Sequence, residues 1–362
     1  MLLQENLTDC RFCTLISQAN GEDPIGTAGT ADHWLVMELP QPWTEKTFQE
    51  NPKIVPLIKL FKQLVLKQGI LLRPVLIAPD KVYSQAGETR IIYYHRPQKQ
   101  FAQFEKQEYI VPEADFTRLA TAIMKQLAKQ PNDLDSFASY RQETSHLREL
   151  LVCTHGNVDI ACSKFGYPIY KKLREEYTDN IRTWRCSHFG GHKFAPTLLD
   201  LPEGRFWGHL KPEMLDLLVY RNGDVTGLRS HYRGWAALKK YEQIAEREIW
   251  MQEGWDWRLM PKSGQTTRKG LQGIKKYLYP LLRRLPSKRV RFFLEQWTQA
   301  ATWAEVQFEF TRLDQSTPTV YQARVEVSGE VLTAAKSPKS GEEIEIKPVP
   351  QYQVSRLGRV VR

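Results

Sequence analysis

Four potential metal ligands constrain this chain more than any other feature of its sequence. Eight residues separate Cys153 from Cys162, and three residues separate His188 from His192. Thiolates and imidazoles are side chains that bind zinc and iron–sulfur centres, and four of them complete the protein's share of such a site. The spacing therefore predicts one metal centre that is built from two separate loops.

Short segments with the character of strands precede both parts of this ligand set. Residues 149–152 are typical of a buried strand that leads to the first cysteine, and residues 182–186 of a strand that leads to the first histidine. Gly190 and Gly191 separate the two histidines, and glycine adopts positive φ and allows a close approach of the backbone. The expected order is strand, ligand loop, helix, strand, ligand loop.

The spacing does not by itself identify the metal. Zinc fingers usually place their cysteines two to four residues apart, whereas the wide loop here suits a larger core, as in the 2Fe–2S cluster of Rieske centres. Zinc, a 2Fe–2S cluster and the absence of any metal all remain open. His155 and Cys186 are alternative ligands because they lie two positions from Cys153 and His188. The two glycines favour the pair of His188 and His192.

The residues around the ligands form two distinctive strings, Cys153-Thr-His-Gly and Cys186-Ser-His-Phe-Gly-Gly-His-Lys-Phe-Ala195. Together with Asp159 and the pattern in residues 8–45, these strings resemble the sucrase/ferredoxin-like family. The resemblance covers roughly residues 8–250. It implies a thioredoxin-like ferredoxin domain that carries a 2Fe–2S cluster on Cys153, Cys162, His188 and His192.

The chain departs from the family's pattern at two positions. Val158 stands where many members have Arg, and Ala161 stands where many have a further Cys. Neither position is a ligand in the implied set, so the assignment of the cluster is unaffected. The polarity around the cluster is expected to differ.

The first part of the chain predicts an α/β domain over residues 1–145, because helical and extended patterns alternate there. Periodicity leaves open whether this domain is a second thioredoxin-like unit without a cluster. Strands are expected over residues 34–39, 71–78, 90–95 and 103–111, and helices over residues 54–68 and 113–127.

Three further segments follow this domain. The thioredoxin-like 2Fe–2S ferredoxin domain is expected over residues 146–256, a basic helical linker over 257–300 and a small antiparallel β module over 301–362. The module is predicted because apolar and polar residues alternate with a period of two in residues 304–310 and 321–327. This alternation is typical of half-exposed strands, and the module lies outside the family resemblance.

The overall composition indicates a soluble, cytoplasmic protein. The sequence has no uncharged apolar run of about 18 residues, so no membrane span is expected. Its first residues lack the basic and apolar regions of a signal peptide. Five cysteines in 362 residues do not suggest a disulfide framework. Cys10 and Cys13 form a C-x-x-C pair, which is either a dithiol site or two small semi-buried residues.

Residues 258–291 contain eleven Lys and Arg and no acidic residue. This segment is either a solvated helical connector or a docking surface for an acidic redox partner, nucleic acid or an anionic membrane. Nucleic acid is disfavoured because no nucleic-acid-binding signature accompanies the charges. The basic residues are Arg258, Lys262, Arg268, Lys269, Lys275, Lys276, Arg283, Arg284, Lys288, Arg289 and Arg291.

These observations lead to two hypotheses about function. The first is an electron-transfer protein with a 2Fe–2S cluster, whose electron donor and acceptor the sequence does not identify. The alternative is a zinc-stabilised binding or scaffold protein that uses its basic segment to contact an acidic partner. A stand-alone enzyme is not indicated, because the chain has no P-loop and no G-x-S-x-G motif. No stretch of the sequence points to the pair of carboxylates that sugar hydrolysis requires.

Overall fold

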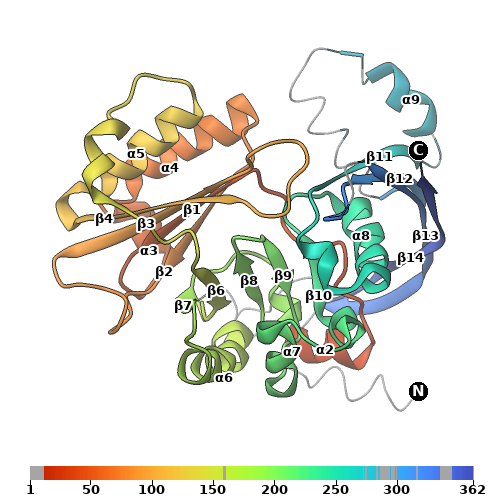
Figure 1. Cartoon of the computed structure of the whole chain (residues 1–362), viewed down its shortest axis with the longest axis horizontal. Coiled ribbons are helices and arrows are strands. Elements are labelled where there is room, and N and C mark those ends of the chain that lie inside the picture. Colours follow the sequence, from red (N-terminus) through yellow and green to blue (C-terminus); the bar gives the residue numbers. More distant parts are fainter. Residues whose placement is uncertain are drawn as a thin grey trace.

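The computed structural model forms a ten-stranded mixed sheet and a four-stranded antiparallel sheet (Figure 1). Within the described residues, no helix combines the length and apolar character needed to cross a membrane. The structure describes residues 12–157, 160–271, 273, 275–282, 284–285, 294, 298, 300–314, 317–334 and 345–361.

The large sheet has the spatial order β10-β9-β8-β6-β7-β2-β1-β3-β4-β5. Its strands in chain order are β1 (His33–Glu38), β2 (Leu72–Ile77), β3 (Glu88–His95), β4 (Glu105–Pro112), β5 (Arg141–Gln142), β6 (Arg148–Cys153), β7 (Ile181–Cys186), β8 (Leu198–Leu201), β9 (Arg205–Trp207) and β10 (Tyr232–Trp235).

The α-helices described are α2 (Cys13–Ala19), α3 (Glu45–Glu50), α4 (Val55–Lys62), α5 (Phe116–Leu127), α6 (Ile160–Glu176), α7 (Leu215–Tyr220), α8 (Lys240–Glu253) and α9 (Lys275–Leu282). A π-helical turn, Gln63–Gln68, extends α4, and Gly69 ends it in the left-handed conformation. The small sheet consists of β11 (Lys262–Gly270), β12 (Trp303–Phe310), β13 (Thr319–Ala334) and β14 (Ile346–Val361).

Burial on both faces explains the continuous apolar runs within the central strands. In β1, Leu35 and Met37 belong to a core beneath α4 and α5, which cover one face of β1–β4 (Figure 1). Trp34 and Val36 point to the opposite face and join the core of the cysteine-bearing half. All six residues of β6 are buried. Such strands carry no period-two alternation, which fits a sheet that is covered on both sides.

The same arrangement of strands occurs twice in the large sheet. In the first half, β1 pairs in parallel with β2 and antiparallel with β3, and β4 follows β3. In the second half, β6 pairs in parallel with β7 and antiparallel with β8, and β9 follows β8. The halves meet where β2 runs antiparallel to β7, at Ile77 and Cys186. The predicted α/β class is confirmed, and one continuous sheet spans the boundary expected near residue 145.

Buried charged side chains tie the two halves together across the sheet. Arg182 of β7 donates to Glu108 of β4 (Nη1–Oε1, 2.9 Å) and to Glu149 of β6 (Nε–Oε1, 2.9 Å). Arg90 also donates to Glu108 at 2.6 Å, and Lys106 donates to Glu149 at 2.7 Å. Burial alone would raise the pKa of Glu108, but Arg182 and the other cations lower it to about 2. Glu108 is therefore ionised inside the protein.

The separate antiparallel sheet confirms the C-terminal β module. The alternation predicted for β12 is present, since Ala304, Val306, Phe308 and Phe310 are buried and the residues between them are not. The expectation of a helical linker over 257–300 is wrong for Lys262–Gly270, which forms β11 and pairs with β12. This strand is polar because it lies at the edge of the sheet, so pairing rather than an apolar pattern defines it.

Lys262 does not contribute to a basic docking surface, because it is fully buried. Its ammonium group donates to the backbone oxygens of Trp257 (2.6 Å) and Met260 (2.8 Å), and burial lowers its pKa to about 7. Arg258 pairs with Glu203. Arg268 pairs with Glu305, and Lys288, Arg289 and Arg291 lie outside the described residues.

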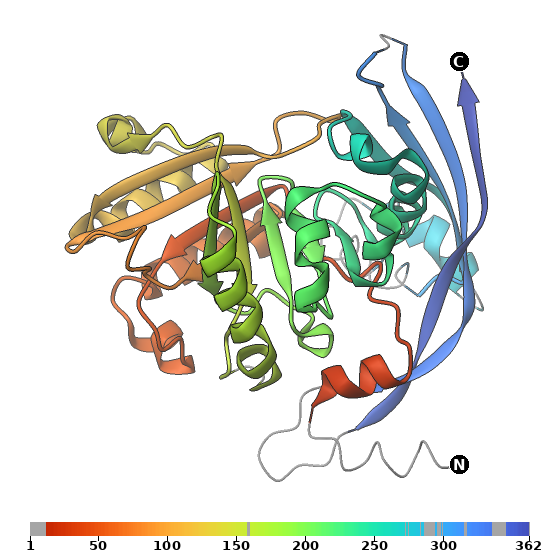
Figure 2. The same ribbon diagram turned by 60° about the horizontal axis from the view of Figure 1, so that its bottom comes forward.

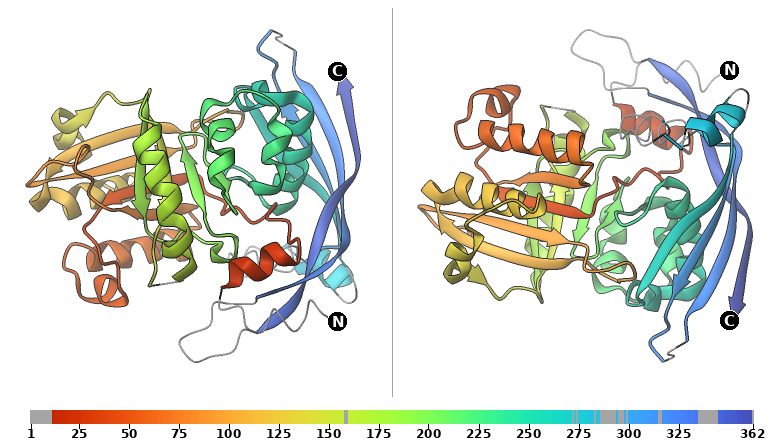
Figure 3. Two further views of the ribbon diagram at one scale, coloured as in Figure 1. Left: turned by 90° about the horizontal axis from the view of Figure 1, so that it is seen from below. Right: turned by 90° about the horizontal axis from the view of Figure 1, so that it is seen from above.

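Helix α2 lies between the second ligand loop and the C-terminal sheet (Figures 2 and 3). Thr14 of α2 donates a hydrogen bond to the backbone oxygen of Ala195 at 2.6 Å. Beyond the helix, Glu22 accepts a hydrogen bond from Thr333 of β13 at 2.5 Å and forms an ion pair with Lys193. Contacts therefore run from the C-terminal sheet through the α2 segment to the loop that follows β7.

Candidate metal centre

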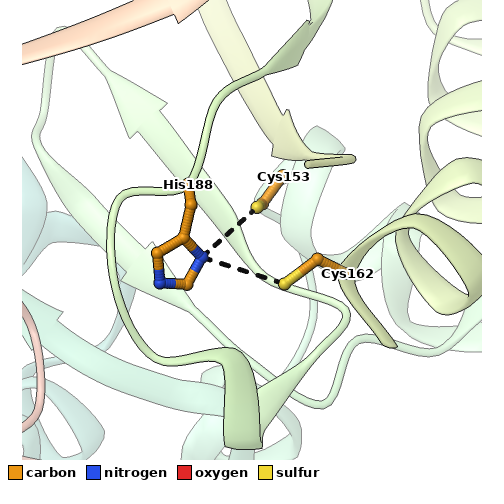
Figure 4. A group of neighbouring side chains, drawn as sticks. All are labelled: Cys153, Cys162 and His188. Atoms are coloured by element: carbon orange, nitrogen blue, oxygen red, sulfur yellow. Dashed lines mark hydrogen bonds between the residues drawn. The ribbon is translucent and has the colours of Figure 1, made fainter. Parts of the chain in front are cut away.

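Three of the four predicted ligands converge, two buried cysteines and the partly buried His188 (Figure 4). The Sγ atoms of Cys153 and Cys162 lie 3.8 and 3.9 Å from Nδ1 of His188. All three ligand atoms lie within 4.8 Å of one another, and both cysteines are buried. Soft thiolates next to an imidazole are a donor set for zinc or for an iron–sulfur centre.

The local topology explains this convergence. Strands β6 and β7 are parallel neighbours in register, so their carboxyl ends, Cys153 and Cys186, lie side by side. Helix α6 connects the two strands, and its first turn brings Cys162 to the same edge. Gly166 permits this approach, because a Cβ at that position would lie 2.2 Å from the backbone oxygen of Cys153. The role of Gly166 was not predicted from the sequence, although a glycine inside a helix often marks a close packing contact.

His192 lies beside this group of three. Its ring centroid is 6.0 Å from that of His188, and the two ring planes are inclined by 38°. Gly190 and Gly191 adopt φ values of +100° and +85°, which is the conformation that the sequence predicted for them. The glycine pair reverses the chain between the two histidines, so the second imidazole stays near the first.

His155 is already engaged through both ring nitrogens. Its Nδ1 accepts a hydrogen bond from the backbone N–H of His188 at 3.2 Å. The proton is therefore on Nε2, which donates to the backbone oxygen of Trp43 at 2.6 Å. To bind a metal, His155 would have to give up one of these bonds in a buried environment. The geometry favours a role in positioning the His188 loop over the alternative role as a ligand.

We expect His155→Ala to weaken metal retention by about 10–100-fold, the usual cost of losing a side chain that orients a metal-binding histidine. The ligands themselves are unchanged, so metal should still bind. The measurement is metal content after competition with a chelator. His146→Ala is the control, because His146 is exposed. Equal retention by both variants, with matching thermal unfolding, would contradict the positioning role.

The two strand-end cysteines differ in their electrostatics. A hydrogen bond with Cys162, followed by the neighbouring His188, lowers the pKa of Cys153 well below the ordinary thiol value despite its burial. Burial, followed by the negative charge on Cys153, raises the pKa of Cys186 well above that value. Because the thiolate is the metal-binding form, the environment favours Cys153 over Cys186 as a ligand.

A buried arginine supports the second ligand loop. Nη1 of Arg233 donates to the backbone oxygen of Gly190 at 3.0 Å, and its other nitrogens donate to Thr27 at 2.9 and 3.1 Å. A Cβ on Gly191 would lie only 2.2 Å from Nη2 of Arg233. Burial, with a contribution from nearby Arg73, lowers the pKa of Arg233 to about 9. Gly191 is therefore required by this contact as well as by its backbone conformation.

Arg233 was not predicted from the sequence, although its aromatic neighbours indicate a buried charge. The residue stands inside the aromatic run Tyr232-Arg-Gly-Trp235, where a charged side chain has to be buried. Of the C-x-x-C pair, Cys13 is buried against Ile16 and Ala334, and Cys10 lies outside the described residues.

Comparison with known proteins gave one match. The model of the sucrase/ferredoxin-like family matches residues 24–234, which is more than half of the chain. The matched region contains all four candidate ligands and Arg233, and it ends before the small antiparallel sheet. No curated protein and no solved structure matched the chain.

Proposed function

The chain belongs to the sucrase/ferredoxin-like family, and from this premise we propose that it is an electron-transfer protein with a 2Fe–2S cluster. Cys153 and Cys162 would hold one iron, and His188 and His192 the other. The observation that carries this proposal is the buried convergence of both thiols on Nδ1 of His188. A cluster bound there would accept and release one electron.

The chain's own residues would give this site its properties. Burial of Cys153 and Cys162 keeps water from the thiolates. His155 fixes the backbone of His188, and Arg233 fixes the Gly190 turn that precedes His192. These contacts hold the ligands in place, so little reorganisation would accompany a change in charge. A rigid, dry site is suited to fast electron exchange.

The proposal includes a thioredoxin-like fold for the cluster-bearing unit, residues 146–256. Its support is the order of β6, β7, β8 and β9, in which a parallel βαβ unit is followed by an antiparallel hairpin. The first half repeats this order in β1–β4. Glu38 occupies the strand-end position that corresponds to Cys153. We therefore propose that the first half is a thioredoxin-like unit without a cluster.

The decisive experiment is a visible and EPR spectrum of anaerobically purified protein, together with iron, sulfide and zinc analysis. We expect a brown protein with two iron and two sulfide per chain, the composition of the proposed cluster. The same donor set fits a single zinc ion. A colourless protein with one zinc per chain would overturn the proposal in favour of a zinc-stabilised binding protein.

The reduction potential should depend on pH. Nδ1 of His188 faces the thiols, so Nε2 is the nitrogen that would take up a proton. Because added negative charge makes this nitrogen more basic, reduction should take up a proton. Where reduction takes up a proton, the potential should fall by about 59 mV per pH unit for each proton, the one-electron value.

Voltammetry from pH 6 to 10 measures this slope. His188→Cys should lower the potential and remove part of the slope if the cluster assembles, because thiolate donates more charge than neutral imidazole. His146→Gln is the matched control and should behave as wild type. A flat potential in the wild-type protein would contradict a titrating imidazole ligand.

A further inference from the structure

A cavity of about 450 Å³ opens beside the candidate metal centre. It is bounded by the end of β6, the first turns of α6, strand β7 and the loop after β1. The side chains that matter for its chemistry are Gln41, Thr154, Ser163, Lys164, Tyr167 and Arg185. The cavity therefore draws on both halves of the large sheet.

The wall of this cavity is formed by the segments that hold both cysteine ligands. Thr154 directly follows Cys153, and Ser163 directly follows Cys162. Thr154 and Ser163 are thus each one residue away from a candidate ligand. A molecule bound in the cavity would lie next to the metal centre without displacing a ligand.

The cavity has cations without anions to neutralise them. Lys164 and Arg185 line it, and neither forms an ion pair with a carboxylate in the described part of the chain. Among the described residues that line the cavity, none is acidic. Positive charges of this kind attract an anion, and a guanidinium group binds carboxylate and phosphate oxygens in a fixed geometry.

A buried hydroxyl group gives a second, independent indication. Thr154 is only 8% exposed, and its Oγ1 has no hydrogen-bond partner among the residues that the structure describes. A buried polar atom without a partner costs about 1–3 kcal/mol, so such atoms normally mark a missing ligand or water. Here the atom belongs to a residue of the cationic cavity.

We propose that this cavity binds a small molecule that carries a carboxylate or phosphate group. Arg185 and Lys164 would donate to its oxygens, and the hydroxyl group of Thr154 would supply the buried hydrogen bond. Tyr167, which is half exposed at the same cavity, offers an aromatic surface to the rest of the molecule. This binding site requires no metal.

One consequence rests on the proposed electron-transfer function. Reduction adds a negative charge next to the cavity, so the bound anion should be held less tightly in the reduced protein. Coupling between two sites is reciprocal. The saturating anion must therefore lower the reduction potential, by the amount that corresponds to the ratio of its dissociation constants in the two redox states.

Isothermal titration calorimetry of the full chain tests the site, with inorganic phosphate, citrate and benzoate as probes in a zwitterionic buffer. We expect one saturable site per chain for at least one probe. Its affinity should fall at least 10-fold in Arg185→Met and in Thr154→Val, the scale of a lost charged or buried hydrogen bond. The preferred probe distinguishes a phosphate ligand from a carboxylate ligand.

Lys171→Met is the control, because Lys171 lies on α6, the helix that also carries Lys164. Its side chain is exposed and pairs with Glu175 at the surface. It removes one positive charge and should leave the affinity unchanged. Absence of saturable binding for all three probes, or equal binding by wild type and both cavity variants, would overturn the proposal. Saturable, variant-sensitive binding to a colourless zinc protein would support the cavity and refute electron transfer.

Discussion

Replacing Cys153 or Cys162 by serine should abolish metal binding and all visible absorption. A serine hydroxyl does not ionise near neutral pH, so it cannot replace a thiolate ligand. Cys186 is the nearest available thiol, but burial raises its pKa and keeps it protonated. The measurement is the visible spectrum together with metal content of anaerobically purified variants, and the expected loss is complete.

Two controls make this result specific. Cys13→Ser and Cys10→Ser should keep the wild-type spectrum, because Cys13 packs against Ile16 and Ala334 rather than in the metal group. Cys186→Ser should also keep it. Full absorbance in the Cys153 variant would falsify the ligand assignment. If the Cys186 variant lost its visible absorption and the Cys162 variant kept it, Cys186 would be the ligand in place of Cys162.

Replacing Arg182 by methionine should destabilise the protein by about 3–5 kcal/mol, the usual cost of breaking a buried ion pair from one side. Glu108 and Glu149 are fully buried, and Arg182 donates to both. Without Arg182, Arg90 and Lys106 remain as their cationic partners. The measurement is the free energy of unfolding from denaturant titration at pH 7.

The matched control is Arg118→Met. Arg118 pairs with Asp133 at the surface, where both side chains are about half exposed. Such a pair contributes about 0–1 kcal/mol. If the two variants lose equal stability, the buried network does not hold the two halves together.

The same network predicts sensitivity to acid. The pKa of Glu108 is about 2 in the folded protein and ordinarily 4.5. The stability that its charge contributes is present above pH 4.5 and is lost as the pH falls toward 2. This part of the acid sensitivity should be smaller in Arg182→Met.

The sequence predicted the parts of the site that depend on local order. Strands were expected before Cys153 and His188 and a helix near Cys162, and these elements bring the three candidate ligands together. The alternation in residues 304–310 likewise predicted the small antiparallel sheet. The place of His192 in the ligand set stays a prediction.

Features that depend on distant contacts could not be predicted in this way. Strand β2 meets β7 through the pairing of Ile77 with Cys186, and no local pattern encodes such a junction. Lys262 looked like a surface charge because it belongs to a basic segment without acidic residues, yet its ammonium group lies against the rings of Trp235 and Trp257. Arg233 acts on the Gly190 turn from 43 positions away. Sequence spacing is informative about ligands, but not about the side chains that support them from other strands.

The contacts between the C-terminal sheet and the ligand loop have a consequence for biosynthesis. A ribosome makes the chain from the N-terminus, so α2 and the loop with Lys193 exist well before Thr333 is synthesised. Until β13 pairs with β14 and Thr333 reaches Glu22, the C-terminal sheet cannot hold the α2 segment against that loop. The loop is therefore more accessible on the growing chain than on the finished protein. For the proposed metal centre, the time needed to synthesise the region between them would set the period in which a metal could reach this more accessible loop.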